Sequence, residues 1–219
     1  MTSAKQTIGI IGSGNIGGAL ARAFTRAGHH VVIANSRGPA TLGALVAELG
    51  ELAAAGTVEQ AAQASDLVVV TIPLGAVASI PSDLLTGRVV IDTNNYYPDR
   101  DGRIAELDDE VLTTSEYVAQ HFAGARVVKA FNHIPALHIA EHAQLAGTSE
   151  RRALMVYGED AAAVERVEAL IEEIGFDALN GGGLAESWRI QRDTPGYGPR
   201  FNAGELTKKL SVARRYSEM

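Results

Sequence analysis

The chain has 219 residues, of which 46% are hydrophobic and 21% charged, and its net charge is −7. This balance is typical of a soluble globular protein with a sizeable core, and the excess of acid argues against a nucleic-acid partner. Cysteine is absent, which excludes disulfides, iron–sulfur clusters and thiolate zinc sites. The longest apolar run, residues 67–72, is too short to cross a bilayer, and no signal peptide precedes the first predicted strand. We therefore expect a cytoplasmic protein with no membrane partner.

The first predicted unit covers residues 7–37. An apolar run at 8–11 indicates a buried strand, a helical pattern extends to about residue 27, and a second strand is predicted at 30–34. Gly12, Gly14 and Gly17 lie between strand and helix with the spacing G-x-G-x-x-G, which in this context predicts a dinucleotide site. Gly12 would permit the tight turn, Gly14 the approach of a pyrophosphate, and Gly17 close helix packing. The first helical amides, at Asn15 and Ile16, would then face the phosphates. The alternative is a glycine turn that binds nothing.

The end of the second strand indicates which dinucleotide is bound. NAD sites usually place an acidic residue there, whereas an arginine accommodates the 2′-phosphate of NADP. This chain has Asn35, Ser36 and Arg37 at that place, and no acidic residue occurs before Glu48. A guanidinium beside a hydroxyl suits a phosphate dianion. The sequence therefore predicts NADP(H), with the alternative that Arg37 is an ordinary surface arginine.

The next elements continue an alternation of strands and helices. A helix is predicted at 39–49, a weak strand at 52–54, a short helix at 58–64, and strands at 66–73 and 88–92. Because ligands bind at the carboxyl ends of parallel strands, Ile72, Pro73 and Leu74 are candidates to pack against the cofactor. Asn94 could offer its amide to the nicotinamide ribose or carboxamide. Each of these positions could also be a simple turn.

The second half of the chain is predicted to complete the sheet. A turn-rich surface loop at 96–102 precedes a helix at 113–121, a strand at 125–131 and a helix at 136–145. Strands at 153–157 and 176–179 flank an amphipathic helix at 161–174, and helical segments follow at 184–190 and 204–215. The whole pattern predicts an α/β fold, a Rossmann-like doubly wound parallel sheet with a small C-terminal extension.

Histidines raise two further questions. His133 follows the strand at 125–131 and is expected to face the same crevice, where it could bind substrate or deliver a proton, or be a hydrogen-bonded loop residue. His138, Glu141 and His142 match H-x-x-E-H, a zinc motif of some peptidases. Such a short pattern arises by chance, and no third ligand follows at convincing spacing. We therefore predict no metal and an exposed polar helix face.

With these residues in view, the sequence resembles the NADPH-dependent deazaflavin (coenzyme F420) reductases, a family that also resembles the NADPH-binding domain of membrane ferric reductases. The resemblance rests on segments spread over most of the chain: IIGSGNIGGALA at 10–21, NSR at 35–37, VVVTIPL at 68–74, VVKAFNHIPA at 127–136, LAES at 184–187 and RFNAGEL at 200–206. It implies 2′-phosphate contacts from Ser13, Ser36 and Arg37. It also implies a nicotinamide beside Ile72 and Pro73, and a homodimer.

The resemblance further implies where the acceptor binds. The deazaflavin would pack against residues 132–136, with Asn132, His133, Ile134 and Pro135 as acceptor-binding residues. We expect an NADP-binding Rossmann domain at 1–132 and a C-terminal portion at 133–219 that completes the second site and forms dimer contacts. The loops at 96–102 and 193–200 lie outside the resemblance and are expected near the acceptor. The predicted function is hydride transfer between NADP(H) and F420; a flavin, ferric chelate, imine or carbonyl acceptor, or a non-catalytic NADP sensor, remains open.

Overall fold

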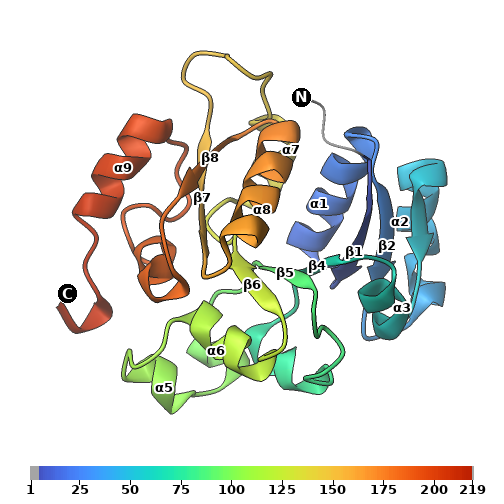
Figure 1. The fold of residues 1–219 in the computed structure, drawn as a ribbon, viewed down its shortest axis with the longest axis horizontal. Coiled ribbons are helices and arrows are strands. Elements are labelled where there is room, and N and C mark those ends of the chain that lie inside the picture. The colour runs from blue at the N-terminus through green and yellow to red at the C-terminus, as the bar shows by residue number, and fades with distance from the viewer. Residues whose placement is uncertain (1–4, 219) are drawn as a thin grey trace.

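The structure is a computed structural model, and it describes residues 5–218. Its centre is an eight-stranded sheet with the order β3-β2-β1-β4-β5-β6-β7-β8 (Figure 1). All neighbouring strands pair in parallel except β6 and β7, which are antiparallel. The strands are β1 (Thr7–Ile11), β2 (His30–Ala34), β3 (Ala53–Ala55), β4 (Leu67–Val70), β5 (Val89–Asp92), β6 (Arg126–Lys129), β7 (Ala153–Gly158) and β8 (Asp177–Asn180).

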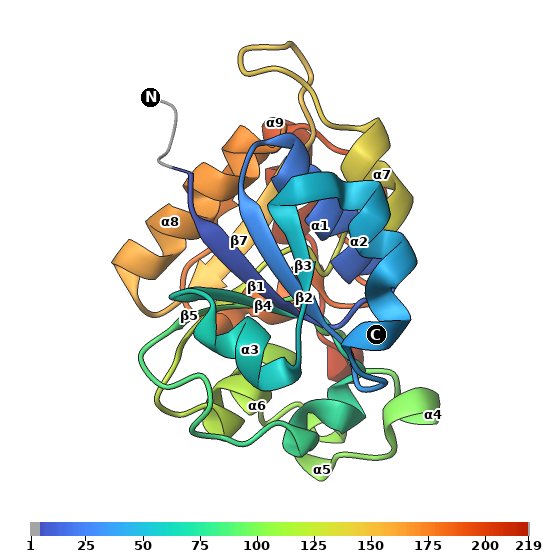
Figure 2. The same cartoon turned by 90° about the vertical axis from the view of Figure 1, so that its right-hand side faces the viewer.

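Helices cover both faces of the sheet (Figure 2). One face carries α1 (Asn15–Arg26), α2 (Gly43–Leu49), α7 (Ala136–Glu141) and α8 (Ala161–Glu173). The other carries α3 (Val58–Gln63) and α6 (Thr114–His121), with α4 (Pro98–Asp101) and α5 (Ala105–Asp108) on the same side in Figure 2. Leu206 of α9 (Ala203–Ser211) packs into this side of the core as well. Because both faces are covered, β4 and β5 are fully buried, as their unbroken apolar sequences predict.

The predicted doubly wound α/β fold is confirmed. The chain adds β2 and β3 on one side of β1 and then returns to add β4, β5 and β6 on the other. This reversal places the carboxyl ends of β1 and β4 next to each other, where open α/β sheets form a ligand crevice. None of the helices among residues 5–218 is long and apolar enough to cross a membrane.

Three expectations about the second half were wrong. The sheet is not parallel throughout, because β7 begins beyond the carboxyl end of β6 and runs back, so that only Val128 and Lys129 pair with it. Helix α7 ends at Glu141 instead of residue 145, and α9 ends at Ser211 instead of residue 215. Residues 184–190 form a 3-10 helix, and the predicted loop at 96–102 contains α4, which Pro98 begins.

Candidate functional site

A crevice of about 350 Å³ lies at the carboxyl ends of the central strands. Its walls come from the glycine turn, from the segments that follow β4, β5 and β6, and from the loop at 193–200. The lining residues are Gly14, Asn15, Ile16, Thr71, Ile72, Pro73, Thr93, Asn94, Asn95, Tyr97, Arg100, Phe131, Asn132, Ile134, Pro135, Ala136 and Tyr197. One cavity therefore contacts six of the predicted cofactor residues and three of the predicted acceptor residues, whereas Ser13, Ser36 and Arg37 do not line it.

The three glycines differ in the space around them. Gly12 has a φ of 117°, and a Cβ there would lie 2.1 Å from the Thr71 carbonyl oxygen. A Cβ on Gly17 would lie 2.0 Å from the Gly12 carbonyl oxygen, so α1 closes directly onto the turn. Gly14 meets nothing within 4 Å. The first and third glycines are thus needed for packing, whereas Gly14 leaves open space at the N-terminus of α1, where an anion is favoured.

Asn35 organises the corner where the second strand ends. Its Nδ2 donates to Ser13 Oγ at 3.1 Å and to Thr41 Oγ1 at 3.0 Å, and its Oδ1 accepts from the Arg37 amide at 2.9 Å. Ser13 is thereby tied to the Ser36-Arg37 turn, as the resemblance implies. Ser36 and Arg37 are exposed, and no carboxylate within residues 5–218 forms an ion pair with Arg37. The sequence named Asn35 only as part of the strand end, because its contact with Ser13 is tertiary, and Thr41 was not predicted.

The segment after β4 separates its three predicted residues. Ile72 and Pro73 line the crevice. Leu74 does not line it. Leu74 begins a 3-10 helix, Leu74–Ser79, and only 1% of its surface is exposed, because it packs into the core on the face of the sheet that α3 and α6 cover. The prediction that Leu74 packs against the cofactor is therefore wrong for this structure, since its side chain turns under the sheet.

A buried charged network holds Asn94 in place. The Asp92 carboxylate accepts from the Asn94 amide at 2.9 Å and from Asn94 Nδ2 at 2.8 Å, and its other oxygen accepts from Lys129 Nζ at 3.1 Å and from Ser115 Oγ. Lys129 also donates to the Asn94 carbonyl oxygen. Burial lowers the pKa of Lys129, and the Asp92 charge opposes that shift. These bonds fix the orientation of Asn94 at the crevice, and one of the two Nδ2 hydrogens is donated to Asp92.

The segment after β6 turns sharply at Phe131, which has a φ of 60° although it is not glycine. Asn132, Ile134 and Pro135 then line the crevice, as predicted. His133 does not face it. The ring is 2% exposed, and its Nε2 accepts from the Met155 amide at 3.0 Å.

The environment of His133 also explains its charge state. Burial, with Arg152 and Lys129 nearby, lowers the pKa of His133 to about 3. The ring is neutral at physiological pH, and its Nε2 lone pair is occupied by the Met155 amide. The expectation that His133 faces the crevice, where it could deliver a proton, is therefore wrong. The alternative of a hydrogen-bonded loop residue fits, because the His133 ring joins β7 to the segment after β6.

Two tyrosines close the far side of the crevice. The hydroxyls of Tyr97 and Tyr197 are 2.7 Å apart and come from the loops at 96–102 and 193–200. The guanidinium of Arg100 stacks 4.7 Å from the Tyr97 ring centroid and is paired with Asp101. Burial and the Tyr97 contact raise the pKa of Tyr197 above its ordinary value, so its hydroxyl stays protonated. No local sequence signal indicated this pair, although both loops were expected near the acceptor.

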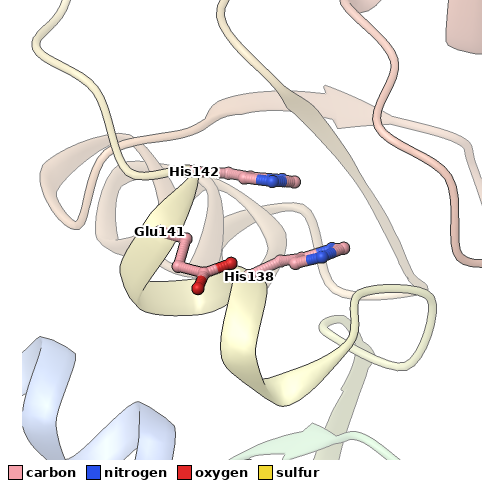
Figure 3. Close-up of side chains that lie close together, drawn as sticks. All are labelled: His138, Glu141 and His142. Carbon is pink, nitrogen blue, oxygen red and sulfur yellow. The ribbon is translucent and has the colours of Figure 1, made fainter.

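The H-x-x-E-H residues lie on and just after α7 with the two imidazoles stacked, their ring centroids 4.0 Å apart (Figure 3). Both Nδ1 atoms contact Arg152 Nη1, His138 at 3.1 Å and His142 at 3.0 Å. Because a guanidinium only donates, both Nδ1 lone pairs accept from it and are not available to a cation. The pair is part of an internal hydrogen-bond arrangement instead of the exposed polar face that was predicted.

Comparisons with known proteins agree with this site. Residues 7–96 match the family model described as NADP oxidoreductase, coenzyme F420-dependent. The chain is also 32% identical to the hypothetical protein SMa0349 of Sinorhizobium meliloti, with a TM-score of 0.76, covering 92% of this chain and 96% of that chain. Over residues 7–96, fewer than half of its length, the chain is similar to the F420-dependent NADP oxidoreductases. It is similar in fold to a proposed F420-dependent NADP-reductase of Arthrobacter sp. fb24, with 23% identity and a TM-score of 0.68 over 84% of this chain and 87% of that one.

Two curated relatives are longer than this chain. Metalloreductase STEAP3 of Rattus norvegicus is 27% identical over 186 residues, which cover 84% of this chain and 35% of that protein. Metalloreductase STEAP2 of Homo sapiens is 26% identical over 189 residues. The chain spans between about a third and a half of the length of the curated relatives it matches.

Proposed function

We propose that this protein transfers a hydride between NADP(H) and the deazaflavin coenzyme F420 within the crevice. One observation carries the proposal: a single cavity joins the open N-terminus of α1 to the segment 132–135. Ile72 and Pro73, beside which the resemblance puts the nicotinamide, line the same cavity. Two ligands bound in one such cavity would be held in contact, which is what hydride transfer requires.

The residues at the glycine turn fit the proposed nucleotide. Gly14 leaves room for a pyrophosphate, and the first turn of α1 contains no acidic residue that would repel it. We assign the 2′-phosphate to Ser13, Ser36 and Arg37, because Asn35 ties the serine to the turn and Arg37 is exposed without an acidic partner in the described chain. NADPH supplies the hydride when bound. The chain's own residues bind and orient the two ligands and exclude water.

The acceptor half of the proposal rests on Asn132, Ile134 and Pro135, which the resemblance assigns to the deazaflavin and which line the cavity. Residues 133–219 supply the rest of that wall, since Tyr197 closes it opposite the glycine turn. In this proposal they form the C-terminal portion that completes the acceptor site, and the active form is a homodimer. Neither His133 nor any other side chain is assigned as an essential acid or base.

The proposal predicts oxidation of NADPH when oxidised F420 is added, followed through the loss of NADPH absorbance. FMN, a ferric chelate and a small cyclic imine are run in parallel, and NADH replaces NADPH in a matched series. We expect turnover with NADPH and F420, and little or none with the other acceptors. Turnover with another acceptor and not with F420 would make that acceptor the substrate and overturn the F420 assignment. NADPH binding without turnover of any acceptor would favour a non-catalytic NADP sensor.

A further inference from the structure

Arg152 occupies an unusual place for a cation. It lies just before β7, and only 1% of its surface is exposed. No carboxylate within residues 5–218 forms an ion pair with its guanidinium; every acceptor around it is neutral. Burying an unpaired charge is costly unless hydrogen bonds replace its hydration, so these contacts must be kept together for the site to persist.

The acceptors of Arg152 come from α7, from the loop at 193–200 and, at 3.5 Å from Nη2, from the carbonyl oxygen of His133 after β6. One nitrogen, Nη1, contacts Nδ1 of His138 and of His142, which follow one another around α7. The other, Nη2, donates to the carbonyl oxygens of Gly198 at 3.0 Å and Pro199 at 3.1 Å. Arg152 therefore fastens the loop at 193–200 to α7.

This fastening acts on the crevice through one neighbouring residue. Tyr197 immediately precedes Gly198, and its hydroxyl meets that of Tyr97 at 2.7 Å across the crevice wall. The Gly198 amide also donates to the His133 carbonyl oxygen at 3.1 Å. Tyr197 is thus held by its own amide, which donates to the Thr194 carbonyl oxygen at 3.1 Å, and by the bonds to Gly198, of which Arg152 makes the charged one.

We propose that Arg152, held by His138 and His142, is a positioning residue that fastens the loop at 193–200 and so keeps Tyr197 against Tyr97 at the crevice. We call these three residues, Arg152, His138 and His142, the Arg152 latch. The latch holds only while both imidazoles are neutral at Nδ1, because a protonated imidazole donates from both nitrogens and cannot accept from a guanidinium. It therefore opens when His142 takes up a proton.

The charges around the pair set the direction of this pH dependence. His142 faces His138 and Glu141 on α7, Arg152 before β7 and Arg200 in the loop. Burial and the positive neighbours lower the pKa of His142, and only Glu141 opposes them. The folded state consequently binds fewer protons than the unfolded chain. The latch contributes stability that is fully present above the ordinary histidine pKa of about 6.5 and is lost as the pH falls below it.

Hydrogen exchange of the loop amides tests the latch without reference to any activity. In the wild-type protein we expect the protection factor of the peptide that contains Gly198, corrected for the intrinsic exchange rate, to fall at least about tenfold between about pH 7.5 and pH 5.5. The double variant His138→Asn/His142→Asn keeps an acceptor oxygen near each Nδ1 position but does not titrate. Its protection is expected to change less than about twofold over the same range.

A matched control and a second readout complete the experiment. His30→Asn makes the same change at an exposed histidine far from α7, and it should behave as wild type. With an accepted substrate, which rests on the proposed function, the acceptor KM should rise at low pH in the wild type only. The NADPH Kd changes with pH because the second pKa of a phosphate is about 6, and that change should be the same in the wild type and the asparagine variant. Unchanged wild-type protection at low pH, or an equal fall in the asparagine variant, would overturn the latch. Failure to bind NADPH would overturn the proposed function and leave the exchange result standing.

Discussion

Replacing Gly14 with alanine is expected to weaken NADPH binding by about ten- to a hundredfold while leaving the stability of the protein unchanged. Gly14 has a φ of −71°, which alanine adopts without strain, and no atom lies within 4 Å of its missing Cβ. The added methyl group would stand in the space that we assign to the pyrophosphate. The same change at Gly17 is expected to lower both the NADPH affinity and the stability of the protein, because its Cβ would lie 2.0 Å from the Gly12 carbonyl oxygen.

The two glycine variants are matched controls for each other. Thermal unfolding of Gly17→Ala should show a loss of about 1–3 kcal/mol, the usual cost of overpacking, whereas Gly14→Ala should unfold with the wild type. Isothermal titration with NADPH then separates binding from folding. If Gly14→Ala bound NADPH with wild-type affinity, the pyrophosphate would not lie at the N-terminus of α1, and the cofactor assignment would be wrong.

Substituting Asp92 with asparagine is expected to destabilise the protein by about 3–5 kcal/mol, the cost of leaving a buried charge without its partner. Lys129 is 2% exposed, and Asp92 is its carboxylate partner in the described chain. The change also turns one acceptor oxygen into a donor that faces the Asn94 amide or Ser115. Because Asn94 lines the crevice, we expect NADPH binding to weaken as well.

A double-mutant cycle separates the charge from the packing. Lys129→Met removes the cation while keeping an apolar side chain of similar length, and Asp92→Asn/Lys129→Met removes both charges. Chemical unfolding should show that the double variant loses less stability than the sum of the two single losses. Strict additivity would mean that Asp92 and Lys129 do not stabilise each other, and that the network around Asn94 is held by other contacts.

Much of the fold could be predicted because local signals and tertiary structure agree. The apolar runs that become β1, β4 and β5 could be predicted as strands from their own composition. The glycine turn could be placed because its spacing is typical of the turn between a strand and a helix. The direction of β7 could not be predicted, since it depends on where the chain re-enters the sheet after α7. A six-residue helix leaves no local signal of that choice.

The candidate site shows the same division. Residues adjacent to a strand end, such as Ile72 and Asn132, could be placed because position along a parallel strand determines the edge of the sheet. The orientation of a side chain could not: His133 follows β6 as closely as Asn132 does, yet its ring turns into the core to meet β7. Tyr97 and Tyr197 are a hundred residues apart in number, so their contact depends wholly on tertiary structure.

The central claim is that this crevice is an NADP site whose selectivity comes from Arg37. Its most direct test is isothermal titration of NADPH and NADH into the wild-type protein and into Arg37→Ala. We predict that the wild type binds NADPH about five- to a hundredfold more tightly than NADH, equivalent to about 1–3 kcal/mol for a charge-assisted phosphate contact, and that Arg37→Ala binds the two alike. Equal wild-type affinity for both nucleotides, or an Arg37→Ala variant with undiminished preference for NADPH, would contradict it.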